Sequence, residues 1–192
     1  MTVFGLTGGI GMGKSTAALL LTQRAIPVID TDHLARDLVA PGQPALQEIT
    51  ATFGPAILSP DGHLDRPQLA ARVFSDPAAR QQLEAILHPR IRAAWTHQID
   101  QWRADGHPTA VVVIPLLFET AAQSAFHATL CLACTPATQQ RRLRQRNWTP
   151  EQIAARIAAQ FPIEKKMALA THVIWTEGPL EIHAAQLLRV IP

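Results

Sequence analysis

The sequence has few cysteines, few charged residues and no long hydrophobic run. Of its 192 residues two are cysteine and 17% are charged, and the formal net charge is +2. No apolar stretch reaches the roughly 18 residues of a membrane-spanning helix, and Met1 precedes a strand candidate instead of a basic and then apolar leader. This composition excludes a disordered chain and a broad nucleic-acid-binding face. We therefore expect a cytoplasmic protein that binds a small anion, with no nucleic-acid or membrane partner.

The two cysteines, Cys131 and Cys134, lie in the apolar run ATLCLAC. A strand directs positions i and i+3 to opposite faces, and no second Cys/His pair with zinc-ligand spacing follows. A redox pair or half of a metal site is therefore disfavoured. We expect two buried structural thiols.

Strands are predicted at residues 2–6, 26–30, 110–114, 128–133 and 172–175. The third and fourth are apolar throughout, as parallel strands covered on both faces are. Helical segments separate the strands, which predicts an α/β fold with a parallel five-stranded sheet flanked by helices. The length suits one compact domain, with room for an inserted subdomain.

Several helix starts are marked by a proline directly after a capping residue, at Thr135-Pro136, Asp76-Pro77 and Thr149-Pro150. Gln152 adds the spacing of a capping box to the last of these. The crossover between the second and third strands, residues 31–108, is almost wholly helical and far longer than the roughly 12 residues that a simple connection needs. This surplus is a candidate binding subdomain.

The segment GGIGMGKS, residues 8–15, matches G-x-x-x-x-G-K-[ST] between a strand and a predicted helix over 14–24. The glycines allow backbone N–H groups to curl around phosphate oxygens. Lys14 supplies a cation for the β- and γ-phosphates, Ser15 offers a hydroxyl to Mg²⁺, and the helix adds its positive end. Each part serves a nucleoside triphosphate.

What happens to the bound nucleotide is a separate question. The chain has no evident Asn-Lys-x-Asp element for reading guanine, and no apolar strand ends in the paired acids of many motor or hydrolase ATPases. Two classes stay open at this point: a small-molecule kinase, and a nucleotide-dependent switch that has no acceptor.

Asp30-Thr31-Asp32 follows the second predicted strand, at the sheet edge where open α/β folds gather their ligands. In extended chain Asp30 and Asp32 point the same way. One could hold Mg²⁺ through water while the other accepts a hydroxyl proton from the acceptor. The alternative is that Thr31 or Asp32 only caps the next helix.

The segment RRLRQRNW contains four arginines near the end of a predicted helix. Arg142 and Arg146 are four residues apart and share a face, so both could close over a triphosphate as a lid. The alternative is a solvated basic helix end, favoured by the helix dipole.

Two further segments carry polar groups. LHPRIR, residues 87–92, offers His88, Arg90 and Arg92 with a predicted helix start at Pro89, and His88 taken alone suits a cap or a packing role. PLLFE, residues 115–119, ends the third strand as an apolar wall with one acid, Glu119.

The motifs LTGGIGMGKST, DTDHLAR, LHPRIR, VVVIPLLFE, RRLRQRN and ARIAAQFPIEKK together resemble the dephospho-coenzyme A kinase family over nearly the whole chain. The resemblance implies a P-loop NTPase fold with three parts. These are a core of residues 1–30, 109–135 and 170–192, an acceptor-binding helical insertion of residues 31–108, and a lid of residues 136–169. It also implies phosphorylation of the 3′-hydroxyl of dephospho-coenzyme A by ATP with Mg²⁺. Another small-molecule or nucleoside monophosphate kinase is the alternative enzyme, and the oligomeric state is left open.

Carried over by residue, the resemblance makes Asp32, Lys14 and Arg142 catalytic, with Asp32 approaching the acceptor hydroxyl. The nucleotide would be held by Gly8, Gly9, Ile10, Gly11, Met12, Gly13, Lys14, Ser15, Thr16, Arg142 and Arg146. The acceptor would contact Asp32, Arg36, His88, Arg92, Leu117, Phe118 and Glu119, and the metal Ser15 and Asp30. Near the adenine, the family pattern has Asp and Asn where this chain has Thr171 and Thr176.

Overall fold

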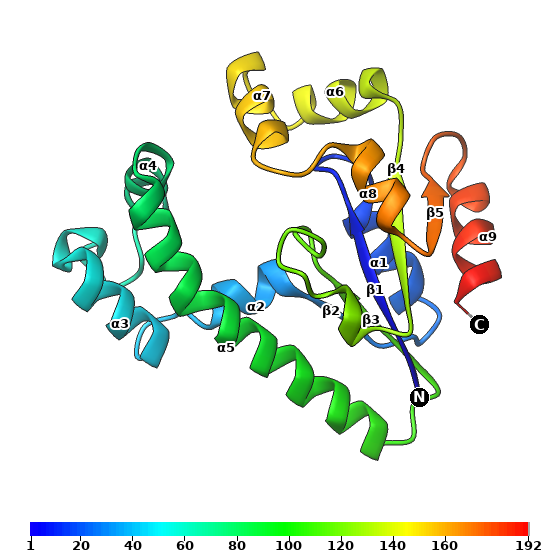
Figure 1. Ribbon diagram of the computed structural model, residues 1–192, viewed down its shortest axis with the longest axis horizontal. Helices are drawn as coiled ribbons and strands as arrows, with labels where there is room; N and C mark the ends of the chain where they lie inside the picture. The colour runs from blue at the N-terminus through cyan, green and yellow to red at the C-terminus, as the bar shows by residue number, and fades with distance from the viewer. Residues whose placement is uncertain (192) are drawn as a thin grey trace. The chain divides into compact units, whose positions relative to one another are not determined.

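The chain forms two compact units, and the first consists of Met1–Asp30 and the chain from Ile99 onward. At the centre of this first unit is a single sheet of five parallel strands in the order β2-β3-β1-β4-β5. The computed structural model describes residues 1–191, except for the side chain of Phe74. The strands, which can be followed in Figure 1, are β1 Thr2–Gly8, β2 Val28–Asp30, β3 Thr109–Val113, β4 Ala128–Ala133 and β5 His172–Trp175. The predicted sheet and its five strands are confirmed.

Three strands differ in their bounds from the prediction: β3 begins and ends one residue earlier than expected, and the bounds of β2 and β1 differ for physical reasons. β2 begins at Val28 because Pro27 has no N–H to donate to the ladder, although its carbonyl accepts from Val111 N at 2.9 Å. β1 continues to Gly8, opposite Leu132 of β4, and therefore carries the chain directly into the glycine-rich loop.

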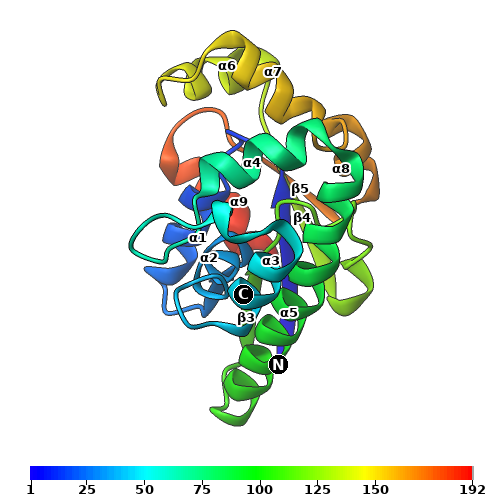
Figure 2. The same ribbon diagram turned by 90° about the vertical axis from the view of Figure 1, so that its left-hand side faces the viewer.

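The helices of this unit are α1 Lys14–Thr22, α6 Pro136–Arg144, α7 Pro150–Ala158, α8 Ile163–Leu169 and α9 Leu180–Val190, with a short 3₁₀ helix at Gln123–Ala125. α6 and α7 begin as predicted: Thr135 accepts from Thr138 N, and Thr149 and Gln152 form a complete capping box. α9 packs beside β5 in Figure 1, and α6 and α7 lie together in Figure 2.

Both faces of the sheet are covered by apolar side chains. On one face Phe4, Leu6 and Leu132 form a buried cluster with Leu21 of α1 and Leu187 of α9. On the other face a Cβ built on Gly5 would lie 2.7 Å from the side chains of Leu117 and Phe126, so this position has room only for glycine. This coverage explains why β1, β3 and β4 have no polar face, whereas β5 at the edge of the sheet is mostly exposed.

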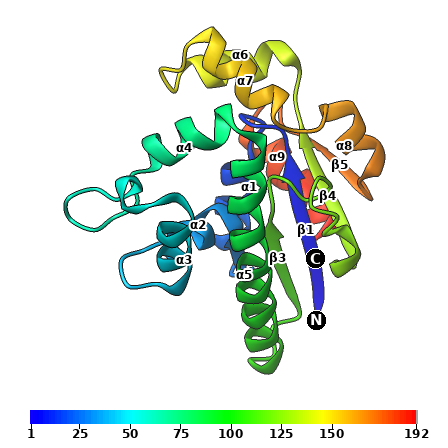
Figure 3. The same ribbon diagram turned by 60° about the vertical axis from the view of Figure 1, so that its left-hand side comes forward.

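Residues Thr31–Gln98 form a second compact unit, distinct from Met1–Asp30 and the chain from Ile99 onward. Its helices are α2 Thr31–Asp37, α3 Pro44–Phe53, a 3₁₀ turn Pro55–Ile57, α4 Arg66–Ser75 and most of α5 Pro77–Ala104. Ile49, Phe53, Ile57, Leu69 and Ile86 belong to a core of its own. The helices that share this core, α3, α4 and the first part of α5, can be followed in Figure 3.

The predicted helix start at Pro89 is wrong, because α5 runs through this residue without a break. Proline removes one helical hydrogen bond and costs about 3 kcal/mol inside a helix. Buried side chains on either side, Ile86 and Trp95, keep the segment helical, and Arg90 Nη1 donates to the Ile86 carbonyl at 2.7 Å. Tertiary packing therefore overrides the local signal. Within residues 1–191, no helix is both long and apolar enough to cross a membrane.

Candidate active site

The loop between β1 and α1 has the backbone conformation that a phosphate cradle needs. Gly11 and Gly13 have φ angles of 75° and 94°, in the left-handed region that favours glycine. A Cβ on Gly11 would lie 2.9 Å from the Leu143 side chain, and one on Gly8 would lie 2.5 Å from the Leu132 carbonyl oxygen. The glycines thus serve both the turn and its close approach to neighbouring chain segments.

Lys14 is positioned over this loop as the sequence predicts. Its Nζ donates to the carbonyl oxygens of Gly8 at 2.8 Å and Gly9 at 3.0 Å. Ser15 and Thr16 are exposed in the first turn of α1, which has no acidic residue. The amino end of this helix is therefore set to attract an anion.

A cavity of about 410 Å³ opens beside the loop. The loop contributes Gly11, Gly13 and Thr16, and the rest of the lining comes from Arg142, Gln145, Arg146, Thr176, Gly178, Leu180 and His183. Its position next to the helix start suits the nucleoside end of a nucleotide whose phosphates occupy the loop.

Arg142 and Arg146 both line this cavity, but they do not share a helix face. α6 ends at Arg144, and Asn147 adopts a left-handed φ of 59°. Arg146 therefore lies beyond the helix, with its guanidinium carbon 5.9 Å from the centre of the Trp148 ring. The expectation that Arg142 and Arg146 share one helix face is therefore wrong, although the fold brings both residues to one cavity.

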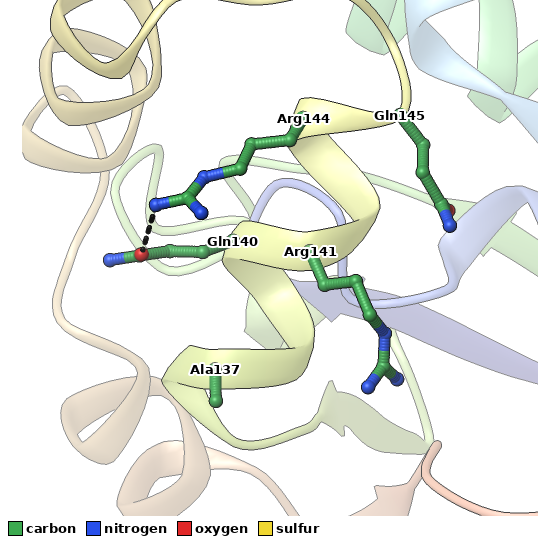
Figure 4. Close-up of a pocket in the computed structure, with 5 residues that line it drawn as sticks. All are labelled: Ala137, Gln140, Arg141, Arg144 and Gln145. Atoms are coloured by element: carbon green, nitrogen blue, oxygen red, sulfur yellow. Dashed lines mark hydrogen bonds between the residues drawn. The ribbon is translucent and has the colours of Figure 1, made fainter.

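The other arginines of α6 lie elsewhere. Figure 4 shows a surface hollow along this helix lined by Ala137, Gln140, Arg141, Arg144 and Gln145, in which Arg144 donates to Gln140 at 3.5 Å. Arg144 does not line the cavity beside the loop. It is a suitable control for Arg142.

His183, which sequence reasoning missed, is 4% exposed at the edge of the same cavity. Burial is the main cause that lowers the pKa of His183, and the nearby Arg142 lowers it further. Its Nε2 has no hydrogen-bond partner among the described residues. A neutral imidazole therefore lines the cavity as a polar group, and a lone histidine in an amphipathic helix gave no signal for this role.

Only one of the two threonines at the expected adenine region lies there. Thr176 lines the cavity, accepts from Arg142 Nη1 at 3.0 Å and donates to the Met12 carbonyl at 3.2 Å. Thr171 instead precedes β5 at the opposite end of the strand, where its side chain bonds to Thr129. Its expected place near the adenine is wrong, because strand β5 separates it from the loop edge of the sheet.

Asp30 and Asp32 do not alternate along an extended segment. β2 ends at Asp30, opposite Val113, and the chain becomes helical at the buried Thr31. Asp32 is therefore an exposed side chain in the first turn of α2, with Arg36 one turn later. The geometry expected from extended chain is wrong, since α2 already begins at Thr31, whereas that reasoning kept residues 30–32 extended.

The two residues expected to hold the metal fit a magnesium ion that takes most of its ligands from phosphate and water. Ser15 and Asp30, from the same unit, supply a hydroxyl and a carboxylate, which are the hard oxygen ligands that Mg²⁺ prefers. Among residues 1–191 there is no group of three or more His, Cys, Asp or Glu side chains that could enclose a metal. Mg²⁺ held by one or two protein ligands and a nucleotide needs no such group.

The expected acceptor residues fall in two places. His88 and Arg92 are exposed, four residues apart on α5. Leu117 is fully buried and Phe118 is 7% exposed, so these two side chains can pack beneath a site but have little surface for contact with an acceptor.

Glu119 lies in a buried ionic cluster that the sequence did not reveal. Lys166 is 0% exposed and pairs with Glu119 at 2.8 Å, while its Nζ also donates to the Pro115 carbonyl at 2.7 Å. Phe161 N donates to the same Glu119 oxygen at 2.8 Å. In the sequence only the motif FPIEKK drew attention to Lys166, and the motif did not indicate which acidic residue this lysine would pair with.

The cysteine prediction is confirmed, since both thiols are free and buried. Burial raises the pKa of Cys131 to about 11. A thiol that stays protonated at neutral pH is a poor nucleophile and a poor metal ligand.

Comparison with known proteins gives matches along nearly the whole chain. The dephospho-CoA kinase family model matches residues 2–181. Dephospho-CoA kinase of Anaeromyxobacter dehalogenans is 45% identical over all of this chain and 91% of its own, and that of Bacillus anthracis is 40% identical over 98% and 95%.

Solved structures agree as well. TT1252 from Thermus thermophilus is 35% identical with a TM-score of 0.85, covering 98% of this chain and 94% of its own. Dephospho-CoA kinase from Campylobacter jejuni is 25% identical with a TM-score of 0.70 over the same shares. The phosphate loop, the parallel sheet and these similarities lead to one conclusion: the chain belongs to the dephospho-CoA kinase family.

Proposed function

We propose that this protein transfers the γ-phosphoryl group of ATP to the 3′-hydroxyl of dephospho-coenzyme A, which yields coenzyme A and ADP. The observation that carries the proposal is Lys14 bound across the glycine-rich loop at the start of α1, in a chain whose relatives are named dephospho-CoA kinase. Expectations of a cytoplasmic location and of no nucleic-acid partner stay predictions.

The chemistry is mainly positioning and charge neutralisation. Loop N–H groups and Lys14 hold the β- and γ-phosphates, and Arg142 and Arg146 approach them from the cavity side. Asp32, two residues after the end of β2, accepts the proton that the acceptor hydroxyl loses as its oxygen bonds to the γ-phosphorus. When bound, Mg²⁺ neutralises charge on the β- and γ-phosphates, and Ser15 and Asp30 would hold it.

The same proposal assigns the acceptor to residues 31–108, with Arg36, His88 and Arg92 as cationic or polar contacts, and lid closure to residues 136–169. Within that lid, Leu143 is fully buried and would touch any side chain added at Gly11. Closure therefore depends on the exposed Arg146 and on α7 more than on the buried face of α6.

An acceptor screen tests the function. The purified protein is incubated with ATP and Mg²⁺ and with dephospho-coenzyme A, nucleoside monophosphates or no acceptor, and ADP release and product mass are measured. The proposal expects a product heavier by one phosphoryl group with dephospho-coenzyme A. ADP release that does not depend on any acceptor would indicate a nucleotide switch instead.

A further inference from the structure

We propose that Gln139 and Gln160 are positioning residues that hold the two peptide groups on either side of Ile10, and so aim the N–H of Gly11 at the donor phosphates. The inference rests on the proposed use of this loop for ATP. It concerns two side chains outside the loop motif, one from α6 and one from the connection between α7 and α8.

The contacts are direct. Gln139 Nε2 donates to the Ile10 carbonyl oxygen at 2.8 Å, and Ile10 N donates to Gln160 Oε1 at 3.0 Å. One glutamine thus acts as a donor and the other as an acceptor. Both polar groups of the Ile10 backbone are bound by side chains that lie 129 and 150 positions away.

Because a peptide group is planar, these two hydrogen bonds also fix the direction of the Gly9 carbonyl and of the Gly11 N–H. All described peptide bonds are trans, so the C=O and N–H of one peptide group point in opposite directions. The Gly9 carbonyl therefore points away from Gln160, and it accepts from Lys14 Nζ at 3.0 Å and Met12 N at 3.2 Å. By the same rule the Gly11 N–H points away from Gln139, and Gly11 itself lines the cavity beside the loop.

The loop needs outside support because its own residues do not restrict it. Glycine visits positive and negative φ with similar ease, and ordering one residue costs about 1–2 kcal/mol of conformational entropy. Gly9 and Gly11 flank Ile10, so each of the two peptide groups between them adjoins a glycine and reorients easily. Hydrogen bonds from α6 and from the connection between α7 and α8 restrict that freedom before ATP arrives.

Both glutamines are themselves held in place. Gln139 is 7% exposed, in the middle of α6. Gln160 precedes Phe161, whose N–H donates to Glu119, and Glu119 is paired with the buried Lys166. The connection between α7 and α8 is therefore anchored to the end of β3, and a movement of α7 would pull on Gln160 and the loop.

Replacing each glutamine by glutamate separates the effect of a lost hydrogen bond to Ile10 from the effect of the added negative charge. Gln139→Glu and Gln160→Glu both add a carboxylate beside Ile10. A carboxylate can still accept from Ile10 N–H, but it cannot donate to the Ile10 carbonyl. We therefore expect Gln139→Glu to weaken ATP binding and kcat/KM by on the order of 10-fold or more, and Gln160→Glu to lose clearly less.

Two further variants complete the design. Gln160→Leu removes the acceptor, so it should lose more ATP affinity than Gln160→Glu, although the latter carries the unfavourable charge. Gln140→Glu makes the same change at an exposed neighbour on α6, and it should leave ATP affinity within about twofold, because an exposed charge away from the loop has little effect.

ATP affinity is measured by equilibrium binding without acceptor, beside steady-state kinetics and thermal unfolding. The inference is tested by ATP binding alone. A failure to phosphorylate dephospho-coenzyme A would therefore overturn the proposed function, but the ATP affinities of the variants would still test the inference. Equal affinities for Gln160→Glu and Gln160→Leu, or a folded Gln139→Glu with wild-type affinity, would overturn the inference. If Gln139→Glu does not fold, Gln139→Leu replaces it and the same criterion applies.

Discussion

Arg142 is bound to Thr176 through both terminal nitrogens of its guanidinium group. Nη1 donates to the threonine hydroxyl at 3.0 Å and Nη2 to its carbonyl oxygen at 2.6 Å. The same hydroxyl donates to the Met12 carbonyl at 3.2 Å. Arg142 is thus connected to the phosphate loop through one threonine, with its charge beside the cavity.

Replacing Arg142 tests whether this charge serves catalysis. An arginine that meets transition-state charge contributes on the order of 10³ in rate, whereas a solvated surface arginine contributes almost nothing. We expect Arg142→Ala to lower kcat by that order and Arg144→Ala, on the surface hollow of α6, to have little effect. Steady-state kinetics on both variants measures the difference, and equal small losses would favour a solvated helix end.

The sequence resemblance led us to expect that Thr176 stands where the family has asparagine, which predicts weaker discrimination among purine nucleotides. We expect Thr176→Asn to increase the ratio of kcat/KM for ATP to that for GTP. Thr171→Ser keeps the hydroxyl that bonds to Thr129 and should leave the ratio unchanged. A strict preference of the unmodified protein for ATP would contradict this prediction.

Lys14→Ala should nearly abolish turnover while the protein stays folded. The side chain donates to two loop carbonyls, and these lie outside the apolar core. Circular dichroism and thermal unfolding check the fold, and ADP formation checks the activity. Normal turnover in a folded variant would contradict the kinase function itself.

Exchanging each aspartate for asparagine tests which one accepts the proton. We expect Asp32→Asn to lower kcat by roughly 10²–10⁴, the range of general-base catalysis, with ATP affinity close to normal. Asp30→Asn should instead raise the Mg²⁺ concentration needed for half-maximal activity. If Asp30→Asn loses the rate and Asp32→Asn does not, the two roles are reversed.

Glu177 provides a prediction about pH. The Thr135 hydroxyl is the main cause that lowers the pKa of Glu177 from 4.5 to about 2, and the Thr138 hydroxyl contributes next. Because the folded-state pKa is lower, the ionised carboxylate stabilises the fold above pH 4.5, and this contribution is lost as the pH falls from about 4.5 toward about 2.

Denaturant unfolding of the wild type and of Glu177→Gln at a series of pH values measures this contribution. The difference in the free energy of unfolding between the two proteins should be largest above about pH 5 and should shrink across that acidic range. A difference that does not change with pH would contradict the assigned pKa.

The sequence was informative wherever the structure depends on neighbouring residues. The strands at 128–133 and 172–175 and the helix starts at Pro136 and Pro150 are confirmed, because apolar runs and capping residues act within a few positions. The phosphate loop was equally readable, since its glycines, lysine and hydroxyl are consecutive. Pro89 shows where prediction from neighbouring residues fails, because buried side chains on both sides of it keep α5 helical.

By itself the sequence determined the family, the sheet and the position of the glycine-rich loop. Only the tertiary structure decided what surrounds them: Gln139 and Gln160 on Ile10, Thr176 on Arg142, and the buried Lys166 on Glu119. The reason is physical. A hydrogen bond between side chains far apart in the chain leaves no periodic signal, and it exists only after the sheet and its helices have brought the two segments together.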